Sequence, residues 1–195
     1  IIMSDYFSLK AIKELKLKNV GKNVKISETC KFYGSEFIEI KDNVRIDAYT
    51  VITAGPELVK IGSYVHIGVN CYIHGRFGVH FRDYSAISSG TRVYSSSDDF
   101  SGTYMTNPTM PRKFVKPFKK KVVIGKFVNV GSNVVIMPGS VLDEGCVVGA
   151  LSFVNKKKLN KWTIYFGSPV IALLKRKKNI LNLEKKLKKE IHEKI

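Results

Sequence analysis

The sequence has few of the residues that stabilise small secreted or metal-dependent folds. Its 195 residues include three cysteines, Cys30, Cys71 and Cys146, which lie far apart and form no CxxC motif. We therefore expect no disulfide framework, no structural zinc site, and a reducing cytoplasm as the compartment. No apolar run approaches the roughly eighteen residues of a membrane span, and no basic region followed by an apolar stretch opens the chain, so neither a span nor a secretory signal is expected.

Acidic residues are also scarce, with 16 Asp and Glu against 33 Lys and Arg and a formal net charge of +17. The excess is concentrated in two places. Residues 155–195 hold 13 Lys and Arg against three Glu, and residues 112–121 hold six with no acid. A basic tail and a basic loop fit anionic small molecules or solubility better than specific nucleic-acid binding, which we do not expect.

Aliphatic or phenylalanine residues recur along the chain with a step of six. They group into triplets, and every position of the six triplets is apolar. A short fixed period of this kind indicates a solenoid in which each step is a short strand followed by a corner. The positions are Val20, Ile26, Phe32; Ile40, Ile46, Ile52; Ile61, Ile67, Ile73; Phe81, Ile87, Val93; Ile124, Val130, Ile136; and Leu142, Val148, Val154.

The residues between the apolar positions fit the corners of such a solenoid. Gly follows the apolar position six times, and a mostly small residue, including each of the three cysteines, stands four positions after it. Three steps make one turn, and stacked turns pair their strands in parallel around one continuous core. We therefore predict an all-β solenoid of about six turns over residues 20–158, with the cysteines as core filler.

The two ends of the chain lack the repeat and are predicted to be helical. Residues 1–19 form a predicted cap, whose helix begins at Ser4 and runs to residue 17. Residues 159–195 are predicted as a closing segment and a basic amphipathic helix from residue 171, which we expect to cap the last open turn and not to bind a membrane. The apolar face of that helix is formed by Ile180, Leu183, Leu187 and Ile191.

The repeat is interrupted once. After Val93 the next residue in phase is Ile124, and residues 95–121 between them are rich in Ser, Asp, Pro and Lys. A long loop that leaves a solenoid is usually functional, so we predict an active-site loop here.

Three stretches of the chain resemble the hexapeptide-repeat, left-handed β-helix acyltransferases. Val122–Gly139 is similar to the coil after the active-site loop, Val147–Lys156 to the coenzyme A-binding turn, and Ile164–Pro169 to the closing Gly-x-Pro segment. The loop Tyr94–Pro108, with Ser-Asp-Asp-Phe-Ser-Gly, resembles the sugar or galactoside O-acetyltransferase subgroup. The resemblance implies a left-handed parallel β-helix, a homotrimer, and acetyl transfer to a sugar in bacterial surface polysaccharide or glycoconjugate synthesis.

The resemblance also implies where acetyl-CoA binds, namely in a groove between neighbouring coils, with no metal. Ser132, Ala150 and Asn155 are expected to border the coenzyme, and the small residue Gly149 to let the pantetheine arm lie against backbone. Three cations are expected to meet its phosphates. They are Lys156, Lys175 and Arg176.

The acceptor, a sugar or nucleotide sugar, is expected near the loop. Relatives place a histidine base there, but no histidine lies between His80 and His192. The matching place falls near Asp98 with Asp99 beside it, and this pair would raise one carboxyl pKa. His66, on a step before the loop, is the alternative base, because imidazole titrates near neutral pH. The expected acceptor-binding residues are Asn70, His74 and Tyr94.

Several functions remain open. The resemblance favours O-acetylation, whereas the missing loop histidine favours N-acetylation of a nucleotide-linked amino sugar, since a free amine attacks a thioester unaided. A zinc carbonic anhydrase-like enzyme shares the coil, but His66, His74 and His80 are spaced eight and six apart instead of about five. A non-catalytic scaffold is the third alternative, against which the loop and the coenzyme turn argue.

Overall fold

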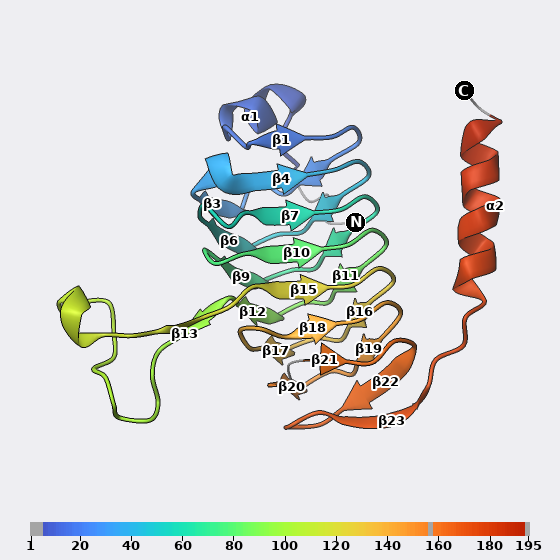
Figure 1. Cartoon of the computed structure of the whole chain (residues 1–195). Coiled ribbons are helices and arrows are strands. Elements are labelled where there is room, and N and C mark those ends of the chain that lie inside the picture. Colours follow the sequence, from blue (N-terminus) through green and yellow to red (C-terminus); the bar gives the residue numbers. More distant parts are fainter. Residues whose placement is uncertain (1–5, 156–157, 194–195) are drawn as a thin grey trace.

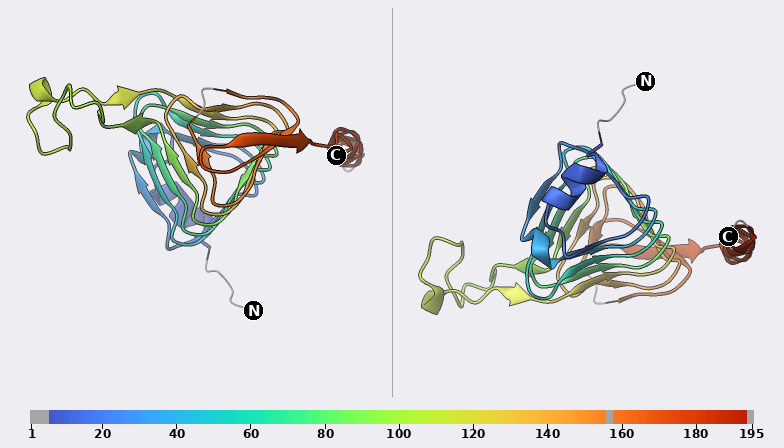
Figure 2. Two further views of the ribbon diagram at one scale, coloured as in Figure 1. Left: turned by 90° about the horizontal axis from the view of Figure 1, so that it is seen from below. Right: turned by 90° about the horizontal axis from the view of Figure 1, so that it is seen from above.

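The computed structural model describes residues 6–155 and 158–193. The chain winds into a triangular prism whose three faces are parallel β-sheets, with a long loop projecting from one corner and a helix standing beside another (Figures 1 and 2). Six complete turns of three strands are followed by a partial seventh. The predicted six-turn solenoid is therefore extended by one incomplete turn.

Sheet 1 has seven strands, sheet 2 has eight and sheet 3 has six. Sheet 1 contains β1 (Asn19–Val20), β4 (Ile38–Ile40), β7 (Val59–Ile61), β10 (Val79–Phe81), β15 (Val122–Ile124), β18 (Val141–Leu142) and β21 (Lys158–Leu159). Sheet 2 contains β2 (Lys25–Ile26), β5 (Arg45–Ile46), β8 (His66–Ile67), β11 (Ala86–Ile87), β16 (Asn129–Val130), β19 (Val147–Val148), β22 (Thr163–Phe166) and β23 (Ile171–Lys175). Sheet 3 contains β3 (Lys31–Tyr33), β6 (Val51–Ala54), β9 (Tyr72–Gly75), β12 (Arg92–Tyr94), β17 (Val135–Ile136) and β20 (Phe153–Val154).

The predicted inward positions form the core. All of them are buried except Val20 and Phe32, which lie in the first turn and pack, partly exposed, against the core. The small residues beside the corners are buried as well, and several donate to a corner carbonyl of the next turn. Thr50 Oγ1 donates to the Gly68 carbonyl at 2.9 Å, and the Cys71 thiol donates to the Ser88 carbonyl at 3.3 Å. These contacts explain why small polar residues and cysteine share this position.

The corner between sheets 1 and 2 carries a ladder of stacked rings. Tyr64 stacks on Tyr84 with centroids 5.0 Å apart, Tyr84 on Phe127 at 5.2 Å, and Trp162 lies 6.3 Å from Phe127. Gly145, at φ +69°, lies at this corner between Phe127 and Trp162, and a Cβ there would lie 2.5 Å from the Trp162 ring. Glycine is needed at this position both for the left-handed backbone and for the ring.

Both helices differ from the prediction. The N-terminal helix α1 spans Leu9–Glu14, and its N-cap is Ser8, whose Oγ accepts from the Ala11 amide at 3.2 Å. The predicted cap Ser4 lies outside the described residues. The predicted C-terminal helix from residue 171 is wrong in its first part, because residues 171–175 form β23 antiparallel to β22.

The C-terminal helix α2 spans Ile180–His192 and does not cap the last turn as predicted. It runs along the corner between sheets 1 and 2 (Figure 1). Lys126 Nζ of that corner lies 2.7 Å from the Glu184 carboxylate of α2. The end of sheet 2 is paired instead by β23, because this strand supplies the hydrogen bonds that β22 lacks on its outer edge.

The interrupting loop leaves the corner between sheets 3 and 1. Its stem is a two-stranded antiparallel hairpin of β13 (Ser96–Ser97) and β14 (Phe118–Lys119), and a 3₁₀ turn, η2 (Arg112–Phe114), lies near its tip; a second 3₁₀ turn, η1 (Ser35–Phe37), precedes β4. Above and below the loop the coil keeps its register, since β15 pairs with β10. The loop is therefore an addition to an uninterrupted prism.

Candidate active site

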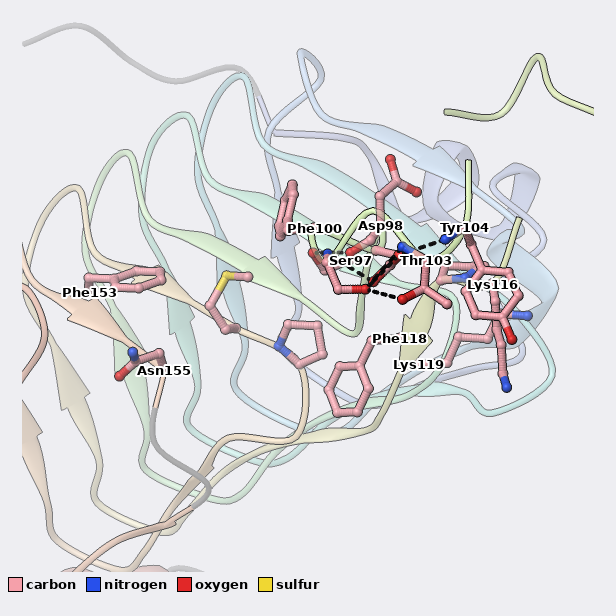
Figure 3. Close-up of a pocket in the computed structure, with 15 residues that line it drawn as sticks. Ser97, Asp98, Phe100, Thr103, Tyr104, Lys116, Phe118, Lys119, Phe153 and Asn155 are labelled. Carbon is pink, nitrogen blue, oxygen red and sulfur yellow. Dashed lines mark hydrogen bonds between the residues drawn. The ribbon is translucent and has the colours of Figure 1, made fainter. Parts of the chain in front are cut away.

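An open groove of about 780 Å³ lies between the loop and the coil (Figure 3). The coil contributes Met137, Pro138, Phe153 and Asn155, which lie on or directly after strands β17 and β20 of sheet 3. The loop contributes aromatic rings, two lysines and two aspartates. They include Asp98, Asp99, Tyr104, Lys116, Phe118 and Lys119. The groove thus offers apolar, cationic and anionic surfaces within one hollow.

Asp99 organises the loop. Its carboxylate accepts from the Ser101 hydroxyl at 2.8 Å, from the Ser101 amide at 3.1 Å and from the Tyr104 amide at 3.0 Å. Hydrogen bonds from the Tyr104 amide and from Ser101 hold the pKa of Asp99 below its ordinary value. Asp99 is therefore not the carboxyl of the pair that would have a raised pKa, because its oxygens accept hydrogen bonds from the turn.

Asp98 has different surroundings. Its side chain is exposed, and its carboxylate points away from the network around Asp99 (Figure 3). It accepts no hydrogen bond from the described residues, so this carboxylate is available to a ligand in the groove.

His74 and Tyr94 lie beside the groove and not in it. They belong to β9 and β12 and form an aromatic cluster with Tyr72, with ring centroids 5.9–6.4 Å apart. His74 Nδ1 lies 3.3 Å from Oγ of Ser96 at the base of the loop. Burial, with a contribution from Arg76, lowers the pKa of His74, which keeps its imidazole neutral near pH 7.

His66 and Asn70 lie on another side of the prism. His66 belongs to β8 of sheet 2, and its Nε2 is 2.7 Å from Oδ2 of Asp47. Asn70 lies in the corner between sheets 2 and 3, where its carbonyl accepts a hydrogen bond from Arg92. Within one chain, the structure therefore does not bring His66 together with Asp98.

The predicted coenzyme residues fall into separate groups. Ser132 and Ala150 lie in the corner between sheets 2 and 3, and Asn155 lines the groove. Lys156 lies outside the described residues. Gly149 has a packing reason of its own, because a Cβ there would lie 1.9 Å from the ring of Phe166. That ring packs against Gly149, and the expected contact of Gly149 with the pantetheine arm stays a prediction.

Lys175 and Arg176 lie at the far end of β23 from this corner. Lys175 Nζ is 3.3 Å from the hydroxyl of Thr163. The Arg176 guanidinium donates to the carbonyls of Phe127, at 2.6 Å, and Gly145, at 3.2 Å. Arg176 thus closes corner carbonyls that the turns leave unpaired, and its expected phosphate role stays a prediction.

Several residues in or near the groove and one beside His66 were not predicted from the sequence. Tyr72 lies on β9, which neighbours the strand of Tyr94 in sheet 3, and it pairs with Arg92. The stacking of successive turns would have placed Tyr72 beside the loop. Asp47 occupies a position that other turns give to Gly or Ser, which is a signal readable in the repeat. The loop residues Lys116 and Phe118 have no such signal, because loop positions do not follow the period.

The zinc alternative is tested by where the histidines lie. His66 is on sheet 2, His74 on sheet 3 and His80 on sheet 1, so one chain cannot gather them around one ion. Among residues 6–155 and 158–193, no group of three or more metal-ligating side chains is present. Neither helix in this part of the chain has the length and apolarity to cross a membrane.

Comparison with known proteins gives extensive similarity, although no family model matches the chain. The dTDP-4-amino-4,6-dideoxy-D-glucose acyltransferase of Escherichia coli is 40% identical over 173 residues, which is 89% of this chain and 90% of that protein. The chain belongs to the hexapeptide-repeat sugar acyltransferases with a left-handed β-helix. The solenoid predicted from the repeat and the family implied by the resemblance are both confirmed, and the protein is an acyltransferase.

Two further members of this acyltransferase family are similar to the chain over different shares of its length. AntD, an N-acyltransferase from Bacillus cereus solved with dTDP and 3-hydroxybutyryl-CoA, is 38% identical, with a TM-score of 0.92 over 97% of this chain and 100% of that one. The galactoside O-acetyltransferase of Lactococcus lactis is 30% identical over 144 residues, covering 63% of this chain and 67% of that protein. The similarity to an aminosugar N-acyltransferase thus extends over more of the chain.

Proposed function

We propose that this acyltransferase moves an acyl group from coenzyme A to the amino group of a nucleotide-linked 4-amino-4,6-dideoxy sugar. The observation that carries the proposal is the 40% identity to an acyltransferase of such a sugar along nine-tenths of both chains. AntD has been solved with dTDP-4-amino-4,6-dideoxyglucose and coenzyme A. The absence of histidine from the loop supports N- over O-acylation, so the alternative of the sequence analysis becomes the main hypothesis.

The chemistry needs little help from a strong base. The neutral amine nitrogen attacks the thioester carbonyl carbon, and the carbonyl electrons move to oxygen. The nitrogen then loses a proton, the C–N amide is completed as the carbonyl re-forms, and the C–S bond breaks to release the coenzyme thiolate, which takes up a proton. Asp98, exposed in the groove, would orient the amine by accepting a hydrogen bond from its N–H.

The same proposal includes an assembly of three copies. Asp98 lies beside sheet 3 and His66 on sheet 2, so a site that contains both must be formed by two chains. A ring of copies that closes around the corner between sheets 2 and 3 would bring sheet 2 of one copy opposite sheet 3 and the loop of the next. Ser132, Ala150 and Asn155 would then border acetyl-CoA or a related acyl-CoA in the shared groove.

The proposed compartment is the cytoplasm. The three cysteines are buried and unpaired, as expected for a protein that folds under reducing conditions.

A panel of acceptors tests the function. Coenzyme A release from acetyl-CoA would be followed with a thiol reagent, using dTDP-4-amino-4,6-dideoxyglucose, its 4-hydroxy counterpart and a free galactoside. We expect release at least about 100-fold faster with the amino sugar, because the site orients an amine and has no loop base. Preference for a hydroxyl acceptor would establish O-acetylation instead. A trimer that fails to bind acetyl-CoA in calorimetry would support the scaffold alternative.

A further inference from the structure

Asp47 is an anomaly in the repeat. It follows the inward residue Ile46 of sheet 2, and the other complete turns carry only Gly or Ser at the equivalent position. These equivalents are Ser27, Gly68, Ser88, Gly131 and Gly149. A carboxylate at a site built for a small residue is buried, with 6% of Asp47 exposed. Burying a charge is unfavourable unless partners compensate for it, so the partners indicate why it is there.

The hydrogen-bond partners of Asp47 connect its buried carboxylate to the protein surface. Arg45 Nε donates to Oδ1 at 2.6 Å, and His66 Nε2 lies 2.7 Å from Oδ2. Burial alone would raise the pKa of Asp47, but hydrogen bonds from Arg45 and His66 outweigh it and lower the pKa. The strand on the other side of His66, β11, contributes the neutral Ala86. Asp47 is therefore an ionised carboxylate that can only accept.

An acceptor-only carboxylate fixes the polarity of the imidazole. Because Asp47 cannot donate, the proton of neutral His66 must sit on Nε2, which leaves a lone pair on Nδ1. About half of the His66 side chain is exposed, so a ligand can reach the imidazole ring that carries Nδ1. The geometry is that of a carboxylate–histidine pair, in which the buried acid selects the tautomer of the base.

We infer that Asp47, held by Arg45, is a positioning residue that sets His66 as the proton acceptor for the amine of the acyl acceptor. This inference rests on the proposed function and goes beyond it by naming the destination of the proton. As the C–N bond forms, the amine nitrogen gives its proton to Nδ1 of His66. When the C–S bond breaks, the imidazolium returns that proton to the coenzyme thiolate, so that one amide and one thiol result.

The first test measures the tautomer directly. In ¹⁵N NMR spectra of the wild-type protein at a pH where the ring is neutral, we expect His66 to be protonated on Nε2. The Asp47→Asn variant keeps the shape but can donate from its amide to Nε2, so the proton should move to Nδ1. A wild-type ring protonated on Nδ1, or a tautomer unchanged in Asp47→Asn, would overturn the inference, whether or not the protein is active.

The second test measures the reaction with the amino sugar. We expect Asp47→Asn to lower kcat by about 100-fold with little change in KM. A fall of this size is typical when a general base is lost. In a His66→Ala background the same change should have no further effect, because both residues act through one proton. The matched control is Asp42→Asn, a carboxylate of the same turn that accepts from the Lys22 amide at 2.6 Å, with unchanged kcat expected.

The outcomes separate the inference from the proposed function. Full activity of His66→Ala, or equal losses from Asp47→Asn with and without His66, would refute the positioning role while leaving N-acylation intact. A wild-type protein that is inactive with every acceptor but shows the Nε2 tautomer would refute the proposed function and leave only the positioning of His66 by Asp47 intact.

Discussion

Adjacent aspartates in the loop have opposite surroundings. Asp99 is enclosed by amides and a hydroxyl of its own turn, whereas the Asp98 carboxylate is exposed above the groove. Their contrast shows that a carboxylate's role follows from what donates to it, because each donor that stabilises the anion also lowers its basicity. At the level of single residues, Asp99 shapes the loop and Asp98 is the side chain that can meet an acceptor.

The titration of Asp99 can be followed through the chemical shifts of the amides that donate hydrogen bonds to its carboxylate. Since hydrogen bonds lower its pKa in the folded protein, the carboxylate stabilises the loop above its unfolded pKa, and this stabilisation is lost as the pH falls through the lower, folded value. In an NMR pH titration, the Ser101 and Tyr104 amide shifts should move only below the ordinary range of an aspartate. Asp99→Asn should abolish that transition, and a transition within the ordinary range would contradict the prediction.

The three cysteines should be chemically inert in the folded protein. Burial raises the pKa of Cys30 and Cys71 to about 11 and that of Cys146 to about 12, so thiolate is scarce at neutral pH. We expect iodoacetamide at pH 8 to leave all three unmodified until a denaturant is added, as followed by intact mass. Rapid alkylation of any of them in the native protein would show that its turn opens readily.

The loop and α2 are the elements that the protein adds to the repeated turns of the prism. The loop leaves one corner while the coil continues in register on both sides of it, and α2 follows the last strand and lies along another corner. Because the core of each turn is built by contacts to neighbouring turns alone, additions at the corners can change function at little cost to stability.

Shortening the loop tests this separation. Ser97 pairs with Phe118 across the stem, so residues 98–117 can be replaced by Asn-Gly, which closes a two-residue hairpin. We expect the variant to keep a melting temperature within about 5 °C of the wild type and to lose acyl transfer, since the groove loses one wall. A large loss of stability would mean that the loop supports the coil.

The attachment of α2 depends on a partly buried ion pair. Burial would raise the pKa of Glu184, but hydrogen bonds from Lys126 and Lys188 lower it. We expect Glu184→Gln to weaken docking of α2 by about 1 kcal/mol. Hydrogen exchange should accelerate in α2 and remain unchanged in the coil, whereas Glu193→Gln, at an exposed pair with Lys189, should change neither. Unchanged exchange in α2 would contradict this prediction.

The whole molecule separates its chemical groups onto different faces. The groove adjoins sheet 3, and the Arg45–Asp47–His66 cluster belongs to sheet 2. Because the three faces of a rigid prism cannot approach each other, cooperation between these groups requires a second copy of the chain.

Mixing two inactive variants tests this assembly. Asp98→Asn chains and His66→Ala chains would be co-expressed and purified as mixed oligomers. If each site takes its loop from one copy and its histidine from the next, about a quarter of the sites contain both wild-type residues, so about a quarter of the wild-type activity should return. Mixtures no more active than either variant alone would place both residues in one chain's site or remove one from the reaction.

The six-residue period by itself determined the solenoid, the inward residues and the buried cysteines, because in a coil each turn repeats the same local environments and a short period fixes which side chains face inward. It also placed the loop, since the period stops there. It did not reveal that residues 171–175 form a strand, because an amphipathic pattern of five residues fits either element until the free edge of β22 selects pairing.

Only the tertiary structure decided how the candidate site residues are distributed. That Asp99 is consumed by its own turn, that Arg176 closes corner carbonyls and that Asp47 lies against His66 all depend on contacts between residues far apart in sequence. Local sequence sets which face a side chain points to, whereas hydrogen bonding across turns and corners sets what it meets, and chemistry depends on the latter.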